Sequence, residues 1–185
     1  MIRILRSELQ EEGPTPLWNA VNVGITALLH QQGRRVVLVF TDGMDSPLSF
    51  GSRNNSLKDV MKRAEEEDVM VYSVGLAASV PMVSRASGGG GRHGRYRGGS
   101  RYINRPDEGL PRLAAVTGGG YYELTRASDL SATFAKIADE LHHQYAIGFT
   151  PPALDGKMHA LELRVSGGEG LTARARKSYL ARNER

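Results

Sequence analysis

The stretch VVLVFTDGMDS, residues 36–46, runs from five apolar residues into Thr41, Asp42 and Gly43. A short, wholly apolar run is typical of a parallel strand that is covered on both faces, so we expect a strand over 35–40. In open α/β sheets, ligands bind at the carboxyl ends of the strands. Asp42 therefore lies where a catalytic or metal-binding carboxylate is expected, unless it only begins a turn.

Helices and strands alternate on both sides of this stretch. Residues 15–31 carry apolar side chains at helical spacing, with Thr15 suited to the N-cap and Pro16 to the first helical position. Two further buried strands are expected, over 69–75 and 120–124. Further helices are expected from Ser56, with a capping box to Asp59, from Gly109 to Gly118, and from Leu130 to Leu141. This alternation predicts an α/β fold with a parallel sheet.

The hydrophobic period changes after Gln144 from helical spacing to alternation. Strands joined by turns at Asp155-Gly156 and Gly167-Gly168 are expected over 144–152, 159–167 and 171–179. We therefore divide the chain into an α/β domain over 1–143 and an antiparallel β extension over 144–185.

Residues 85–105 are rich in glycine and arginine and contain no acidic residue. Such a run has little apolar surface to bury, which predicts a flexible loop. Arginines interleaved with tyrosines also suit phosphate contacts and base stacking, so nucleic-acid binding is an alternative function. The residues that would serve it are Arg92, Arg95, Tyr96, Arg97, Arg101 and Tyr102.

The composition excludes several classes of protein. The 185 residues are 40% hydrophobic and 24% charged, as in globular domains, and no run approaches the ~20 apolar residues of a membrane span. The N-terminus lacks the apolar core of a signal peptide. With no cysteine, disulfides and thiolate metal sites are excluded.

Sequence motifs of enzymes are also missing. A haloacid-dehalogenase phosphatase would have its nucleophilic aspartate two residues before Asp42, where this chain has Phe40. There is no Gly-x-Ser-x-Gly nucleophile elbow and no Gly-Lys-Ser/Thr phosphate loop. We therefore expect a protein that is not an enzyme.

Several segments together resemble the von Willebrand factor A (VWA) domain. They are GPTPLWNAVNVGITALL at 13–29, RRVVLVFTDGMDS at 34–46, VYSVGL at 71–76 and LAAVTGGGYYEL at 113–124. The tail from Phe134 to Tyr179 is similar to that of a bacterial VWA-related subgroup. The resemblance implies the C-terminal part of a doubly wound parallel sheet with an antiparallel β tail.

The family has a metal-ion-dependent adhesion site at the carboxyl ends of its strands. Thr15 matches the family's threonine motif and Asp42 its final aspartate motif, so the resemblance implies that both contribute to a Mg²⁺ site. The Asp-x-Ser-x-Ser motif is absent. The string from Asp129 to Thr133 has its spacing but begins a helix. Because two ligands are few, we expect this chain alone to bind Mg²⁺ or another divalent cation only weakly or not at all.

The resemblance also has implications for partners and location. It implies a protein-binding, adhesion-type module whose partner supplies an acidic residue to the metal. The first strands of the family fold have no counterpart here, so the strand at 35–40 would expose an apolar edge that a chain supplying the missing strands could cover. Many relatives with this tail are exported, which favours an extracytoplasmic location.

Overall fold

A parallel three-stranded sheet forms the centre of the protein. The computed structural model describes residues 14–48, 53–80, 102–167 and 170–183. The strands β1 (Arg35–Thr41), β2 (Val69–Leu76) and β5 (Tyr121–Leu124) lie in the order β1-β2-β5. Arg35 is opposite Val69, and Ser73 is opposite Tyr121. The three predicted strands are confirmed to within a residue at each end, and the fold is α/β.

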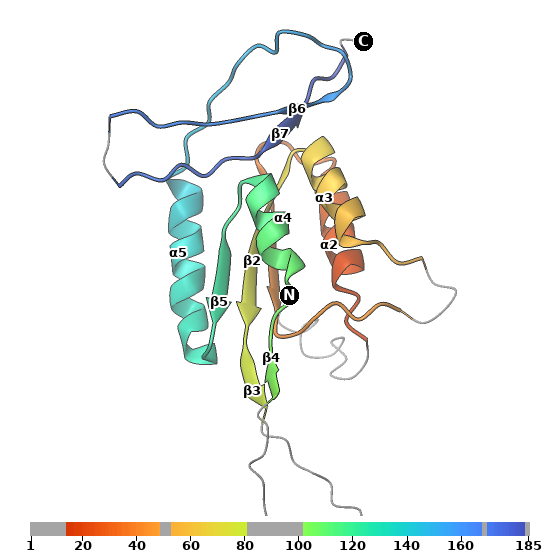
Figure 1. Ribbon diagram of the computed structural model, residues 1–185, viewed down its shortest axis with the longest axis vertical. Helices are drawn as coiled ribbons and strands as arrows, with labels where there is room; N and C mark the ends of the chain where they lie inside the picture. The colour runs from red at the N-terminus through yellow and green to blue at the C-terminus, as the bar shows by residue number, and fades with distance from the viewer. Residues whose placement is uncertain (1–13, 49–52, 81–101, 168–169, 184–185) are drawn as a thin grey trace, which may run out of the picture.

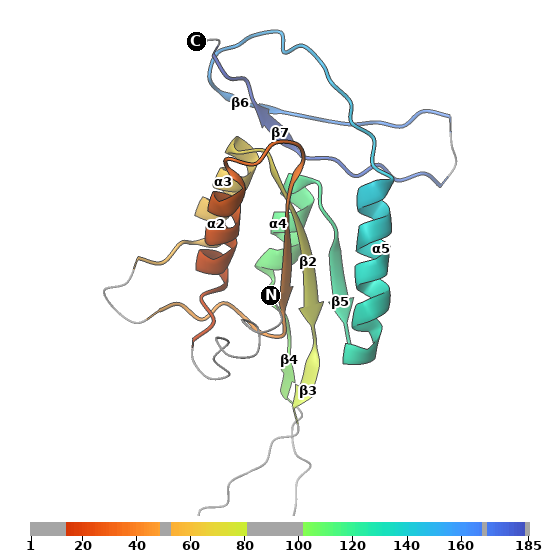
Figure 2. The same cartoon turned by 180° about the vertical axis from the view of Figure 1, so that it is seen from behind.

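Helices cover both faces of this sheet (Figures 1 and 2). The helices α2 (Leu17–Leu28), α3 (Leu57–Glu66) and α4 (Gly109–Thr117) share one face, and α5 (Leu130–His142) lies on the other. Side chains alternate across a strand, so each strand contributes to two hydrophobic clusters. Helices on both faces explain why β2 is apolar at nearly every position.

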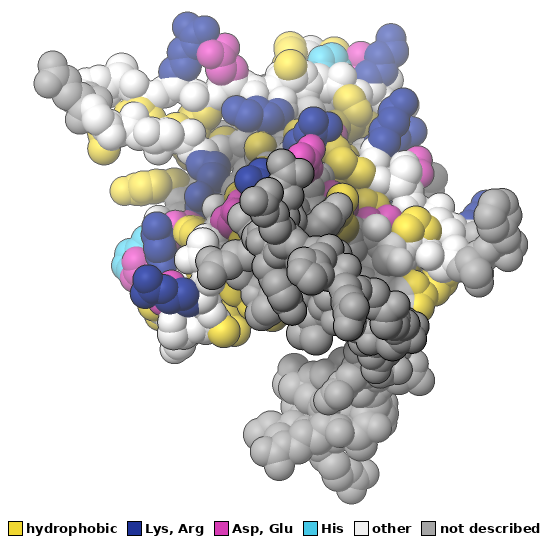
Figure 3. Space-filling view, turned by 60° about the horizontal axis from the view of Figure 1, so that its bottom comes forward, with side chains coloured by type: hydrophobic (Ala, Val, Ile, Leu, Met, Phe, Trp, Pro, Cys, Tyr) yellow, Lys and Arg dark blue, Asp and Glu magenta, His cyan; other side chains and the backbone are white. Residues whose placement is uncertain are grey.

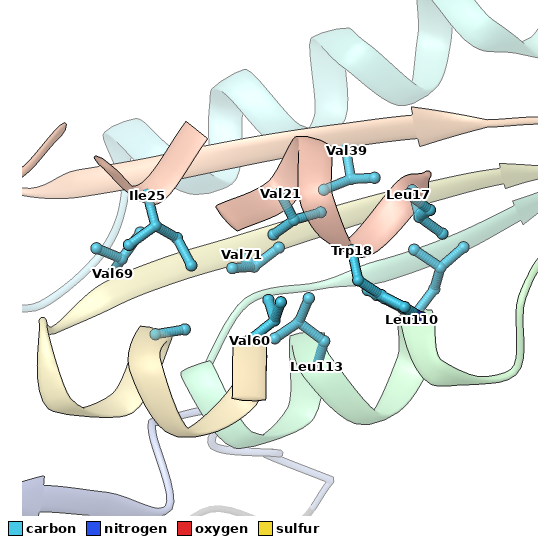
Figure 4. Close-up of a cluster of buried hydrophobic side chains, with 11 residues drawn as sticks. Leu17, Trp18, Val21, Ile25, Val39, Val60, Val69, Val71, Leu110 and Leu113 are labelled. Carbon is cyan, nitrogen blue, oxygen red and sulfur yellow. The ribbon is translucent and has the colours of Figure 1, made fainter. Parts of the chain in front are cut away.

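The larger cluster joins α2, α3 and α4 to the sheet. Figure 4 shows Trp18 and Leu110 side by side at one end of it, and Ile25 beside Val69 at the other. Gly109 is part of this packing, because a Cβ there would lie 2.6 Å from the Trp18 ring. The cluster consists of Leu17, Trp18, Val21, Ile25, Val39, Val60, Ala64, Val69, Val71, Leu110 and Leu113.

The predicted helix ends are confirmed in two places and wrong in one. Ser56 and Asp59 form the capping box of α3, and Gly118 ends α4 with a φ of +79°. However, α2 begins at Leu17 with Pro16 as its N-cap, and Thr15 does not cap it. The backbone carbonyl of Thr15 instead accepts a hydrogen bond from the Leu17 amide at 2.7 Å.

The tail contains less strand than its sequence predicts. Among the described residues of the tail, only β6 (Met158–Ala160) and β7 (Ser178–Leu180) form strands, and they pair antiparallel. Residues 144–152 are not a strand, although Tyr145, Ile147 and Phe149 alternate, because their segment has no strand partner among the described residues. The tail lies across the amino ends of the sheet strands (Figure 1).

A second antiparallel pair lies beyond the carboxyl end of β2. It joins β3 (Ala78–Val80) to β4 (Tyr102–Asn104). The predicted flexible loop at 85–105 is therefore wrong for residues 102–104, whose backbone pairs with β3. Residues 85–101 lie outside the described part of the chain.

Candidate functional site

The turn that follows β1 is fixed by Thr41. Its side chain is buried, and its hydroxyl oxygen accepts a hydrogen bond from the Gly43 amide at 3.2 Å. A hydroxyl that bonds the backbone two residues further on is a known turn-forming contact. The turn leaves Asp42 exposed at the carboxyl edge of the sheet. The polar residues after the apolar run therefore both end the strand and present a carboxylate.

Two hydrogen bonds hold the segment after this turn against the start of α2. The Ser46 amide donates to the Thr15 carbonyl at 2.8 Å, and the Trp18 amide donates to Asp45 Oδ1 at 3.3 Å. The carboxylate of Asp45 thus takes one of the free amides at the helix N-terminus, where negative charge is favoured. These contacts bring the segments of Thr15 and Asp42 to the same edge of the sheet.

Asp107 links this segment to α4. Its Oδ2 accepts a hydrogen bond from the Asp45 amide at 3.0 Å, and its Oδ1 accepts one from the Gly109 amide at 2.8 Å. One carboxylate therefore joins the turn after β1 to the first turn of α4. The Pro106-Asp107 pair is a local turn pattern that sequence analysis could have noted. Its contact with Asp45, 62 residues away, has no local sequence signature.

The donor set at this edge fits a divalent cation only in part. Mg²⁺ and Ca²⁺ prefer oxygen ligands, which the Thr15 hydroxyl and the Asp42 carboxylate could provide. Asp45 and Asp107 already accept backbone hydrogen bonds. Within the described ranges, no group of three or more His, Cys, Asp or Glu residues could hold a metal ion. The edge could therefore supply a minority of the ligands of a cation.

The string from Asp129 to Thr133 begins a helix, as its sequence predicts. A 3₁₀ turn over Ala127–Asp129 leads into α5, and Thr133 Oγ1 donates to the Asp129 carbonyl at 3.0 Å. Asp129 is the N-cap residue, but its side chain makes no capping hydrogen bond.

The residues of the alternative nucleic-acid site are mostly outside the described part of the chain. Of that set, the structure places only the backbone of Tyr102, in β4; the other five, Arg92, Arg95, Tyr96, Arg97 and Arg101, are not described. On the face that Figure 3 shows, several Lys and Arg side chains lie beside Asp and Glu side chains. Arg176 is paired with Asp68, for example.

A polar cluster at the amino side of the sheet was missed by sequence analysis. Glu140 on α5 accepts hydrogen bonds from Tyr122 at 2.5 Å, from Tyr72 at 3.3 Å and from Arg174 of the tail. Gln144 Nε2 also donates to the Tyr72 hydroxyl at 2.8 Å. The cluster joins the tail to both α5 and the sheet.

The solved structures that this chain resembles include two that match it at low sequence identity. A conserved hypothetical protein BatB from Bacteroides thetaiotaomicron is 19% identical, with a TM-score of 0.45 over 75% of this chain and 64% of that one. An uncharacterized membrane spanning protein from Vibrio fischeri is 16% identical, with a TM-score of 0.41 over 62% of this chain and 51% of that one.

The chain thus spans less than two thirds of the length of either neighbour. No protein-family model matches it, and no curated protein does. Among the helices of the described residues, none has the length and apolar character needed to cross a membrane.

Proposed function

We propose that the chain is a non-enzymatic protein-binding module of the VWA type, with a partial metal site at the carboxyl edge of the sheet. One observation in particular supports this proposal. The Ser46 amide donates to the Thr15 carbonyl at 2.8 Å, which ties the segment after Asp42 to the segment before α2. The backbone segments that carry Thr15 and Asp42, 27 positions apart in sequence, therefore lie at one edge of the sheet.

In this proposal a divalent cation is the bridge to the partner. The cation would supply positive charge and open coordination positions for an oxygen ligand. Thr15 and Asp42 hold it, and an acidic side chain of the partner protein completes its coordination. Because Mg²⁺ dehydrates reluctantly, two protein ligands bind it weakly, at millimolar levels as an order of magnitude.

Fluorescence anisotropy with a labelled glutamate-containing peptide tests this function. We expect weak binding in Mg²⁺ that disappears in EDTA and in Asp42→Ala. Asp129→Ala is the matched control, because it removes an exposed aspartate from the start of α5, where the sheet strands also end. Binding that persists in EDTA, or that Asp42→Ala leaves unchanged, would contradict the proposal.

A further inference from the structure

Helix α3 ends in a run of acidic residues. Glu65 and Glu66 lie in its last turn, Glu67 is its C-cap, and Asp68 follows. The C-terminus of a helix carries partial negative charge, so carboxylates are unfavourable there, and neighbouring carboxylates also repel one another. Lys62 pairs with Glu66 from within the helix at 3.7 Å. The other carboxylates are therefore stabilised by positive charge from elsewhere in the chain.

Three tail side chains meet three of these carboxylates. Their positions, 176, 178 and 182, are separated by even numbers of residues, so in an extended chain they point to one face. Arg174, two residues earlier, continues the row and pairs with Glu140 of α5. The three pairs at the end of α3 are Arg176 with Asp68, Ser178 with Glu65 and Arg182 with Glu67.

The seam between the tail and the rest of the protein is polar and loosely packed. The side chains of the two ion pairs at the end of α3 are between 34% and 64% exposed. Ion pairs that are open to solvent are weak, and salt screens them. A cavity of about 380 Å³ also lies in the seam, where a close-packed interface would leave no such space. Its walls include Arg35, Glu65 and Asp68 on one side and Phe149, Arg176 and Tyr179 of the tail on the other.

The tail is held together by contacts of its own. The ring of Tyr179 meets those of Phe149 at 4.9 Å and His159 at 5.5 Å, and all three belong to the tail. The strands β6 and β7 pair with each other. The Lys177 amide, by contrast, joins the tail to α4, because it donates to the Val116 carbonyl at 3.0 Å. The tail thus has internal contacts that do not depend on its contacts with the helices.

We propose that residues 174–182 form a strap that these charges hold against the end of α3, and that the tail opens as one unit while the sheet stays folded. Local opening of this kind occurs where a segment is joined to its domain by few apolar contacts and by exposed polar ones. The strap lies at the amino end of the sheet, opposite the proposed metal site (Figure 1). The opening is tested in EDTA, so that the two proposals fail separately.

Amide hydrogen exchange of the whole chain, followed by NMR, tests the opening. The Lys177 amide reports on the seam, and the Ala181 amide reports on the tail itself, because it donates to the Lys157 carbonyl at 2.9 Å. Raising NaCl from about 0.1 M to about 1 M shortens the screening length from about 10 Å to about 3 Å. We expect both amides to exchange about fivefold faster, since a detached two-stranded pair is marginal by itself. The amide of Val71, which is buried in β2, should exchange at an unchanged rate.

Asp68→Asn tests the charge alone, because asparagine also tolerates the φ of +53° at this position. We expect faster exchange at Lys177 in low salt and a smaller effect of added salt. Arg176→Gln should do the same, and the double variant should add little, because both substitutions break one pair. Asp129→Asn, at the far end of α5, removes an equal charge and should behave as the wild type. Exchange at Lys177 that ignores salt or Asp68→Asn, or that quickens equally at Val71, would overturn the proposal.

Discussion

Replacing Glu140 by glutamine should loosen the attachment of the tail. The Glu140 carboxylate is three-quarters buried and accepts hydrogen bonds from Tyr72, Tyr122 and Arg174. Glutamine keeps one acceptor oxygen and replaces the other with a donor, so at least one of these three groups loses its acceptor. The ion pair with Arg174 is lost as well.

The expected loss in the free energy of unfolding is about 2 kcal/mol. Hydrogen bonds to charged groups contribute roughly 1.5–3 kcal/mol. The lower half of that range applies here, because the Arg174 side chain is 42% exposed and solvent screens its interaction. With an m-value of about 2 kcal/mol per molar urea, the unfolding midpoint should fall by about 1 M.

Urea unfolding followed by the fluorescence of Trp18, the single tryptophan, measures this shift. Trp18 lies in the larger cluster and is 4% exposed, so its emission reports on unfolding. Asp139→Asn is the matched control, because Asp139 precedes Glu140 on α5 and its side chain is 74% exposed. The control should change stability by less than about 0.5 kcal/mol. An unfolding midpoint for Glu140→Gln equal to that of the wild type would refute this account of the cluster.

The difference in unfolding free energy between the wild type and Glu140→Gln should depend on pH in one direction. Burial raises the pKa of Glu140, but the hydrogen bonds from Tyr122 and Arg174 outweigh it and hold the pKa below its ordinary value of 4.5. A carboxyl with a lowered folded-state pKa contributes stability that is complete above the unfolded pKa. The difference between wild type and Glu140→Gln should therefore be full at neutral pH. It should disappear as the pH falls through the lowered pKa.

Three further predictions concern the packing and the polar groups. Gly109→Ala should lower the free energy of unfolding by about 1–3 kcal/mol, because its Cβ would lie 2.6 Å from the Trp18 ring. Thermal unfolding measures this loss, and an unchanged melting temperature would contradict the close packing of Gly109 against Trp18. Ser56→Ala should cost about 1 kcal/mol by removing the N-cap of α3, again by urea unfolding, and no loss would contradict the capping role. Burial and the hydrogen bond to Glu140 raise the pKa of Tyr122 to about 12. The ultraviolet titration curve of Tyr122→Phe should therefore lack one tyrosine that ionises at high pH, and a curve equal to that of the wild type would contradict this.

The sheet could be predicted because its determinants are local. The apolar run before Thr41 and the one at 69–75 have strand lengths and end in turns, so their type and ends follow from the sequence. The capping box of Ser56 could be predicted for the same reason, since both of its residues lie within one helical turn.

The tail could be predicted only in part, because alternation shows which side chains share a face and not whether a partner strand is present. Tyr145 and Ile147 alternate as strand residues do, yet they are 92% and 72% exposed. The site shows the same limit. The position of Asp42 at the carboxyl edge could be predicted because Asp42 directly follows a strand. The place of Asp107 at the same edge could not be predicted, because it depends on a contact with the distant Asp45.

The proposed metal site is tested most directly by paramagnetic line broadening in the NMR spectrum of the chain, with Mn²⁺ in place of Mg²⁺. Broadening reports weak binding and its location at the same time. We expect the amide signals of Thr15 and of residues 42–46 to broaden together, to recover when Mg²⁺ is added in excess, and to be unaffected in Asp42→Ala. In Asp129→Ala they should broaden as in the wild type. Broadening that is centred elsewhere, or that persists at Thr15 in Asp42→Ala, would contradict the account.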